Sequence, residues 1–286
     1  MSNIKAIISD VDGVMVGKRD GFNFPLPHKE VLSKLEHTSA HGIPIVLCTA
    51  KFGFAIKQIA VQAKLHNPHI TDGGAVVIDW LAGKIISQQS IDKGTVAACL
   101  KSSLEQNIYT ELYTANTYFV QASQNSDFTE RRSRVLQASP KIVESLVSIA
   151  QTQDIIKIIN FSEGERDIPK LEANVEKLSG AVNYIWTQHP FLKPRRPMVI
   201  TAPGVSKQHA VQEVADYLEI PFSSILGIGD SEADWSFMQL CGYVATIGED
   251  GGRLQELSRA KGEGQYYLAK PVDDHGLLEA MRYFGV

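Results

Sequence analysis

Short apolar runs alternate with amphipathic segments at both ends of the chain. The runs have the length of buried strands, and the segments between them carry apolar side chains at helical spacing. The predicted strands are Ile4–Ile8, Ile43–Leu47, Ile225–Ile228, Val244–Ile247 and Tyr266–Leu268. The predicted helices are His28–Ala40, Phe54–Leu65, Lys207–Leu218, Ala233–Leu240 and Leu254–Ala260. This alternation is typical of an α/β fold with a doubly wound, Rossmann-like parallel sheet.

The middle of the chain, residues 83–200, has a different pattern and follows a strand predicted at Val76–Asp79. Its predicted strands are Ile108–Tyr113, Thr117–Ala122, Ile155–Phe161 and Val182–Thr187, and its predicted helices are Lys93–Gln106, Lys141–Thr152 and Pro169–Leu178. Two consecutive strands without a helix between them indicate an antiparallel sheet and an α+β module. We therefore expect a core formed by residues 1–82 and 201–286, with residues 83–200 as an inserted α+β domain.

Composition narrows the class of protein. The 286 residues are 44% apolar and 21% charged, which is the usage of ordinary globular proteins. A net charge of -4 disfavours binding along the phosphate backbone of nucleic acid. We expect neither a signal peptide nor a membrane span, because no stretch approaches the roughly 20 apolar residues that a spanning helix needs. Three widely spaced cysteines, Cys48, Cys99 and Cys241, indicate a reducing compartment, so we expect a cytoplasmic protein.

Carboxylates follow two of the predicted strands. Asp10 and Asp12 come directly after the first strand and are followed by a glycine. Ligands of open α/β sheets bind at the carboxyl ends of the strands. A carboxylate there can attack phosphorus and form an acyl phosphate, while its neighbour transfers the proton. Asp230 follows a later strand and Asp234 lies one helical turn further, so both add hard oxygen ligands suited to Mg²⁺.

Two further segments suit the oxygens of a phosphate group. Thr49, Ala50 and Lys51 follow the second strand and offer a hydroxyl group, backbone amides and a cation. Lys207 opens a predicted helix, where a cation is disfavoured by the helix dipole unless an anion lies there too. Thr49, Ala50, Lys51 and Lys207 are therefore our candidate substrate-binding residues.

Together, these four motifs resemble the signature of the haloacid dehalogenase (HAD) superfamily of phosphotransferases. The inserted module lies between the Thr49 and Lys207 motifs, and the sequence Ile-Thr-Asp-Gly-Gly-Ala ends at Ala75 before it. This arrangement is similar to the Cof-like branch with a type IIB cap domain, whose members include sugar phosphatases. The resemblance covers essentially the whole chain, with the motifs confined to the two core segments. It implies a Mg²⁺-dependent phosphatase that acts on a small phosphorylated metabolite, with substrate specificity set by the cap.

The resemblance also implies roles for individual residues. Asp10 would be the nucleophile, and Asp12 the general acid that protonates the leaving alcohol and then activates water. Thr49 and Lys207 would hold the phosphoryl group during transfer. The metal site that it implies consists of Asp10, the backbone carbonyl of Asp12, and Asp230, with Asp234 in or just outside the coordination shell.

The sequence departs from the family pattern at a few positions. Ala50 and Lys51 replace glycine and arginine, Gly73 and Ala233 each replace an asparagine, and Glu249 stands where asparagine is common. These changes affect substrate contacts more than reaction type, because the catalytic carboxylates and the lysine are kept. Two alternatives stay open: a phosphomutase of hexose phosphates on the same fold, and a non-catalytic phosphometabolite-binding protein on a degenerate scaffold.

Two other groups of residues receive no catalytic role. His66 and His69 have no further ligands at local spacing, so we expect them in a loop. The basic clusters formed by Arg131, Arg132 and Arg134, and by Lys193, Arg195 and Arg196, are typical of solvated faces. The alternative for these clusters is contact with a second anionic group of the substrate.

Overall fold

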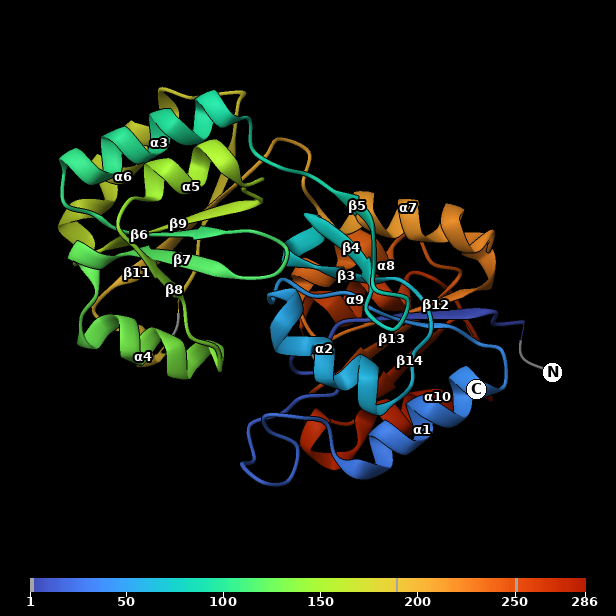
Figure 1. The fold of residues 1–286 in the computed structure, drawn as a ribbon. Helices are drawn as coiled ribbons and strands as arrows, with labels where there is room; N and C mark the ends of the chain where they lie inside the picture. The colour runs from blue at the N-terminus through green and yellow to red at the C-terminus, as the bar shows by residue number, and fades with distance from the viewer. Residues whose placement is uncertain (1–2, 189, 250–251) are drawn as a thin grey trace. The chain divides into compact units, whose positions relative to one another are not determined.

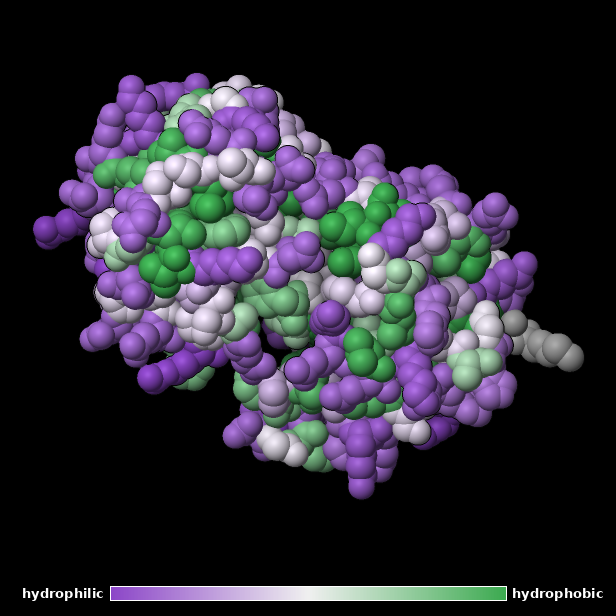
Figure 2. Space-filling view, viewed as in Figure 1, coloured by the Kyte–Doolittle hydropathy of each residue, from purple (hydrophilic) through white to green (hydrophobic). Residues whose placement is uncertain are grey.

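The computed structural model describes residues 3–188, 190–249 and 252–286 (Figure 1). The chain forms two compact units. The first comprises Met1–Phe52, Ile56–Ser87 and Ser206–Val286, and the second comprises Gly53–Ala55 and Gln88–Val205. In both units, hydrophilic residues surround separate hydrophobic patches on the face shown in Figure 2.

The first unit is built on a five-stranded parallel sheet. Its strands are β1 (Ala6–Ser9), β2 (Ile45–Leu47), β12 (Ile225–Gly229), β13 (Tyr243–Ile247) and β14 (Tyr266–Ala269). Their spatial order is β14-β13-β12-β1-β2, and the register aligns Ile8 with Val46 on one side and with Gly227 on the other. The strands are nearly continuous apolar runs because both faces of the sheet are covered.

Helices cover both faces of this sheet. The helices of the first unit are α1 (Lys29–Ala40), α2 (Gly53–Gln62), α7 (Lys207–Leu218), α8 (Trp235–Met238), α9 (Arg253–Arg259) and α10 (Gly276–Tyr283). Side chains alternate between the faces of a strand. On β1, Ile7 packs with Leu35 of α1 and Met281 of α10, whereas Ile8 packs with Val211 of α7 and Phe237 of α8. The prediction of a doubly wound α/β core is confirmed.

A second, three-stranded sheet belongs to the same unit. It consists of β3 (His69–Thr71), β4 (Val76–Asp79) and β5 (Lys84–Gln88), in the order β3-β4-β5. Residues 84–87 were predicted to lie in the inserted module, but in the structure they belong to the first unit, where β5 pairs with β4. The pattern did not reveal β5 because its residues are exposed or only half-buried.

The second unit contains a six-stranded sheet. Its strands are β6 (Tyr109–Tyr113), β7 (Tyr118–Gln121), β8 (Lys141–Val143), β9 (Lys157–Ser162), β10 (Asn183–Trp186) and β11 (Arg196–Thr201). The order is β10-β11-β9-β6-β7-β8, and only the β7–β8 pair is parallel. Its helices are α3 (Lys93–Glu105), α4 (Asp127–Leu136), α5 (Leu146–Thr152) and α6 (Ile168–Glu176).

The two faces of this sheet are packed differently. Leu112 and Ile158 face an apolar cluster that includes residues of α3, α5 and α6. On the other face, the ring of Phe128 in α4 packs edge-on against Tyr109 and Phe161, with centroid distances of 4.8 Å and 5.1 Å. The second unit is therefore an α+β structure with a mainly antiparallel sheet.

Short 3₁₀ helices complete the described secondary structure. They are η1 (Asp72–Gly74), η2 (Ala122–Gln124), η3 (Glu165–Asp167), η4 (Pro190–Leu192), η5 (Phe222–Ser224), η6 (Glu232–Asp234) and η7 (Val272–Asp274). No helix within the described ranges is both long enough and apolar enough to cross a membrane.

The predicted helix Lys141–Thr152 is wrong in its first half. Residues 141–143 form the edge strand β8, and α5 begins only at Leu146. Ser145 caps this helix, because its side chain accepts a hydrogen bond from the amide of Ser148 at 3.3 Å. A serine cap interrupts an apolar pattern that would otherwise continue as one helix.

Arg132 was expected on a solvated face, but in the structure it is buried. It lies in α4, is 6% exposed, and donates from Nε to both carboxylate oxygens of Glu111 at 3.2 Å. Its Nη2 also donates to the hydroxyl of Tyr113 at 3.3 Å. A buried arginine requires such a counter-charge, and Glu111 supplies it from the neighbouring strand β6.

His69 is likewise not a loop residue, although His66 is. His69 begins β3, is fully buried, and accepts a hydrogen bond at Nδ1 from the amide of Leu47 at 3.2 Å. Its ring stacks on Trp80 with a centroid distance of 5.2 Å. Burial lowers the pKa of His69 to about 4, because the charged imidazolium is poorly solvated there.

This burial predicts a pH-dependent stability. The unfolded chain takes up a proton at this side chain near pH 6.5, whereas the folded chain does so only near pH 4. Stability is therefore lost as the pH falls through this window, by about 2 kcal/mol between pH 7 and pH 5. His69→Gln keeps an acceptor for Leu47, so denaturant unfolding of this variant should depend less on pH. His66→Gln, at an exposed position, is the matched control. If both variants reduced the pH dependence of the unfolding free energy equally, this dependence would not come from His69.

Candidate active site

The candidate residues follow strands that end at one edge of the parallel sheet. Asp10 follows β1, Thr49 lies just beyond β2, and Asp230 follows β12. The backbone continues the sheet pairing at this edge, since the amide of Asp10 donates to the carbonyl of Ile228 at 2.9 Å. Parallel strands necessarily bring these residues to the same end of the sheet.

Lys207 bridges two buried carboxylates. Its Nζ lies 2.7 Å from Oδ1 of Asp10 and 2.7 Å from Oδ1 of Asp234. Lys207 is the first residue of α7, and the preceding Ser206 caps this helix by accepting a hydrogen bond from the amide of His209 at 3.1 Å. The cap therefore sets where α7 starts and thereby where the ammonium group lies.

The charges in this cluster do not balance. Burial raises the pKa of Asp10 to about 7, with a further rise from Asp234, although Lys207 acts in the opposite direction. Burial acts to lower the pKa of Lys207, but its acidic neighbours, above all Asp10, raise it overall. One ammonium group thus only partly compensates the surrounding carboxylates, and an additional positive charge would stabilise their ionised forms.

Asp230 completes a group of three carboxylates. Asp10, Asp230 and Asp234 each offer an oxygen within 4.8 Å of the others. Desolvation and the negative charge of Asp234 raise the pKa of Asp230 to about 6. Gly13 makes room for this side chain: its φ is +74°, and a Cβ added there would lie 1.9 Å from Oδ2 of Asp230. The donor set consists only of hard oxygen atoms and fits a divalent cation such as Mg²⁺.

Asp234 also organises the backbone around it. Its Oδ2 accepts hydrogen bonds from the hydroxyl of Ser231 at 2.9 Å and from the amides of Ser231 and Asp230 at 3.2 Å and 3.3 Å. Ser231 was not among the residues predicted from the sequence. The Ser-x-x-Asp spacing of Ser231 and Asp234 is the signal that could have found it, because it matches a capping box.

Asp12 and Lys51 form a second, more open pair. The Nζ of Lys51 lies 2.6 Å from Oδ1 of Asp12, and about half of the Asp12 side chain is exposed. The sequence analysis assigned Lys51 to the substrate and did not predict this contact. No sequence pattern indicates this ion pair, because Asp12 and Lys51 come from different loops.

Thr49 and Ala50 complete the set of predicted site residues. Thr49 is buried, and its hydroxyl accepts a hydrogen bond from the amide of Lys51 at 3.0 Å. Its carbonyl accepts a hydrogen bond from the amide of Gly73 at 3.1 Å, and Gly73 has a left-handed φ of +72°. Ala50 is exposed and contributes backbone groups only. All eight predicted site residues therefore belong to the first unit. Hydrogen bonds or ion pairs link all of them except Ala50 into two sets.

Known proteins resemble this chain over nearly its whole length. A curated phosphatase, YwpJ of Bacillus subtilis, is 21% identical over an alignment of 303 positions that covers 98% of this chain and 99% of the relative. A haloacid dehalogenase-like hydrolase from Bacteroides thetaiotaomicron has a similar structure, with a TM-score of 0.81 at 14% identity and coverage of 98% of both chains. The subclass IIB sugar phosphatase BT4131 gives a TM-score of 0.71 at 19% identity, covering 98% of this chain and 99% of that one.

The structural similarities show a shared fold, and a sequence profile identifies the family. The profile of haloacid dehalogenase-like hydrolases matches residues 7–260. This range includes every candidate residue of the site. The chain therefore belongs to the haloacid dehalogenase-like hydrolase family.

Proposed function

We propose that this protein is a Mg²⁺-dependent phosphatase that hydrolyses a small phosphorylated metabolite of the sugar-phosphate class. The observation that carries the proposal is the position of Lys207 between the carboxylates of Asp10 and Asp234, at 2.7 Å from each. This arrangement places a strong anion-binding cation beside a nucleophilic carboxylate. The family and a relative named as a phosphatase support the reaction class, and a sugar phosphatase with the same fold supports the substrate class.

Asp10 is the proposed nucleophile. Its carboxylate oxygen attacks phosphorus, the bond from phosphorus to the leaving oxygen breaks, and an aspartyl phosphate results. The ammonium group of Lys207 binds the equatorial oxygens of the phosphoryl group and opposes the charge that develops there. The hydroxyl of Thr49, the amide of Ala50 and the ammonium group of Lys51 add further donors.

Asp12 is the proposed acid and base. It protonates the leaving alcohol oxygen in the first half of the reaction. In the second half it removes a proton from water, which attacks phosphorus and releases Asp10 as a carboxylate. The ion pair with Lys51 holds the exposed side chain of Asp12 in place. Lys51 would thus orient the acid as well as approach the substrate.

The three carboxylates would hold Mg²⁺. Asp10 and Asp230 would contact it directly, together with the backbone carbonyl of Asp12, and Asp234 would lie in or beside the shell. When bound, this ion would neutralise charge on the phosphate oxygens and let the monoanionic carboxylates approach them. Burial raises the pKa values of Asp10 and Asp230, and the charge of Asp234 raises them further, so a bound cation would favour the ionised forms of both side chains.

The proposal also covers the choice of substrate, the partners and the cellular compartment. Every proposed catalytic residue comes from the first unit, so we assign the choice of substrate to the second unit. We expect no nucleic-acid or membrane partner, in line with the net charge of -4. The three buried free cysteines suit the reducing conditions of the cytoplasm.

A phosphate-release assay tests the proposal. p-Nitrophenyl phosphate and a panel of sugar phosphates should release inorganic phosphate with Mg²⁺ and stop doing so with EDTA. A phosphomutase would convert a hexose 1-phosphate to a 6-phosphate with little free phosphate. No EDTA-sensitive turnover of any compound would favour the binding protein instead.

Asp10→Asn should abolish turnover without unfolding the protein. The amide is nearly isosteric with the carboxylate but is a poor nucleophile, so kcat should fall by more than about 1,000-fold. Circular dichroism and the Tm establish that the variant is folded. Turnover close to that of the unmodified enzyme would exclude Asp10 as the nucleophile.

Asp230→Asn should weaken the binding of Mg²⁺ to the enzyme. Loss of a ligand carboxylate should raise the Mg²⁺ concentration for half-maximal activity by about tenfold or more. The matched control is Glu232→Gln, which removes an exposed carboxylate two residues away. An unchanged Mg²⁺ titration for Asp230→Asn would place the metal elsewhere.

Asp12→Asn should separate the two halves of the reaction. p-Nitrophenolate leaves without much protonation, so the first half should stay fast while hydrolysis of the intermediate slows by about 100- to 10,000-fold. Rapid mixing should then show a burst of p-nitrophenol followed by a slow phase. Breakdown of the intermediate at the original rate would mean that another residue is the base.

A further inference from the structure

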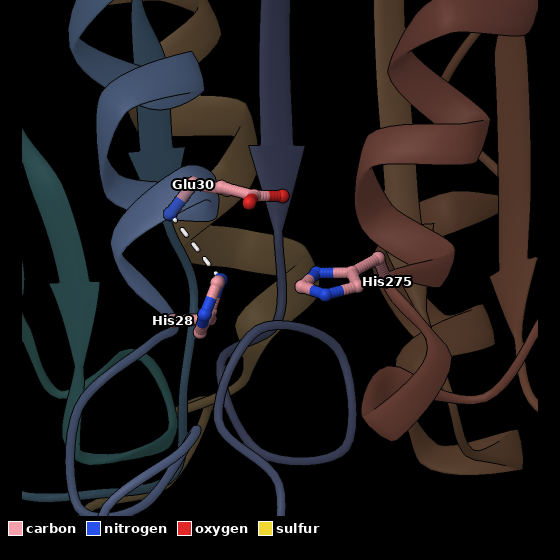
Figure 3. A group of neighbouring side chains, drawn as sticks. All are labelled: His28, Glu30 and His275. Carbon is pink, nitrogen blue, oxygen red and sulfur yellow. Dashed lines mark hydrogen bonds between the residues drawn. The ribbon is translucent and has the colours of Figure 1, made fainter.

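Two histidines and a glutamate meet where helices α1 and α10 begin. His28 directly precedes α1, Glu30 lies in its first turn, and His275 directly precedes α10. Each offers one ligand atom, and these atoms lie within 4.8 Å of one another. Figure 3 shows Glu30 and His275 reaching into the space between the two helices, with His28 beside them. In the described part of the chain, one other such group exists, the carboxylate cluster of the candidate active site.

Ring packing holds the two imidazoles side by side. The centroid of His28 lies 4.9 Å from that of His275 and 4.6 Å from that of Phe22. Phe22 also contacts His275 edge-on at 5.6 Å. Below them, Leu35 of α1 and Met281 of α10 belong to the same apolar core. These contacts link the start of α1 to the start of α10.

The backbone of His275 is in an unusual conformation. Its φ of 59° and ψ of 35° are left-handed, a region that favours glycine or asparagine. Such a conformation costs a non-glycine residue free energy, and residues of this kind concentrate at functional sites. The side chain of His275 does not cap α10, so helix capping does not explain a histidine here.

The side chains of His28 and Glu30 also offer ligand atoms to a metal. Nδ1 of His28 accepts a hydrogen bond from the amide of Glu30 at 3.4 Å, a long bond at an exposed position. Coordination through Nε2 would leave this contact in place, and coordination through Nδ1 would replace only this one bond. Glu30 is exposed, so its carboxylate can rotate toward the imidazoles.

We propose that His28, Glu30 and His275 form a binding site for a divalent transition metal, with Zn²⁺ as the best match. Zinc binds imidazole and carboxylate at about 2.0–2.2 Å, so ligand atoms that lie within 4.8 Å of one another need to approach by no more than about 1.5 Å through side-chain rotation. Two nitrogen ligands favour Zn²⁺, Ni²⁺ or Cu²⁺ over Mg²⁺ and Ca²⁺, which select oxygen. Water would fill the remaining positions.

The helix dipoles strengthen this choice of metal. The starts of α1 and α10 are both positive ends, which disfavour a cation held by electrostatic attraction alone. Coordinate bonds from neutral imidazoles overcome this, and the charge of Glu30 offsets it. The bound metal would tie the start of α1 to the start of α10. It would also fix the end of the segment that runs from Asp12 to His28, independently of the proposed phosphatase activity.

Cu²⁺ bound to the metal-free protein provides a direct probe of the ligands. Electron paramagnetic resonance, recorded with excess Mg²⁺ to occupy the carboxylate cluster, should show nitrogen hyperfine splitting. The cluster of Asp10, Asp230 and Asp234 offers only oxygen, so it gives no such splitting. Zn²⁺ should compete with the Cu²⁺ signal, bind with one equivalent in calorimetry, and raise the Tm.

Variants test the assignment. His28→Ala and His275→Ala should each weaken Zn²⁺ binding by about tenfold or more, since loss of even an outer partner typically costs 10- to 100-fold. Glu30→Gln keeps the size of the side chain and should also weaken binding. The matched control is His37→Ala/His41→Ala, which removes a second histidine pair of α1 and its flank, with centroids 4.1 Å apart. Circular dichroism establishes that each variant is folded.

The proposal fails under three outcomes. Zn²⁺ could leave the Tm and the calorimetric signal unchanged in the unmodified protein. The nitrogen splitting could persist in His28→Ala and His275→Ala but vanish in the control. The affinity for Zn²⁺ could also stay the same in all of the single variants.

Discussion

The contact of Lys207 with Asp10 and Asp234 is the constraint on which the candidate site depends. Two carboxylates buried this deeply repel each other and lose their hydration, and the shared ammonium group offsets both effects. The three residues come from the end of β1, the start of α7 and the turn after β12, which are far apart in the sequence. The contact therefore exists only when the core of the first unit is formed.

The chemistry of the site follows from this arrangement. One positive charge among the carboxylates of Asp10, Asp230 and Asp234 leaves an excess of negative charge. Burial and, to a smaller extent, this repulsion raise the pKa values of Asp10 and Asp230. A divalent cation and a phosphate dianion can enter such a site together, because each compensates the charge of the other. Gly13 makes this possible at short range, since any side chain there would collide with Asp230.

Much of the core could be predicted from the sequence because its signals are local. Buried parallel strands are apolar runs, and the residues that follow them lie at one edge by the geometry of the fold, so Asp10, Thr49 and Asp230 could be placed together. The start of α7 at Lys207 was also predicted, and in the structure Ser206 caps this helix.

The remaining features depend on partners that are distant in the sequence. The ion pair of Lys51 with Asp12 and that of Arg132 with Glu111 join separate segments, so neither leaves a local pattern. His69 is buried because β3 lies beside the end of β2, where Cys48 pairs with Ile70, and because its ring stacks on Trp80. In the second unit, β8 was taken for helix because its three residues continue the apolar spacing of α5.

The central claim is that Asp10 carries the phosphoryl group during turnover. The most direct measurement is to quench the enzyme in acid during turnover of p-nitrophenyl phosphate, reduce it with borohydride and sequence its peptides by mass spectrometry. Reduction converts an aspartyl phosphate to homoserine. If Asp10 is the nucleophile, homoserine should replace aspartate at position 10 and at no other position. Homoserine at position 12 or 230, or none while phosphate is being released, would contradict it.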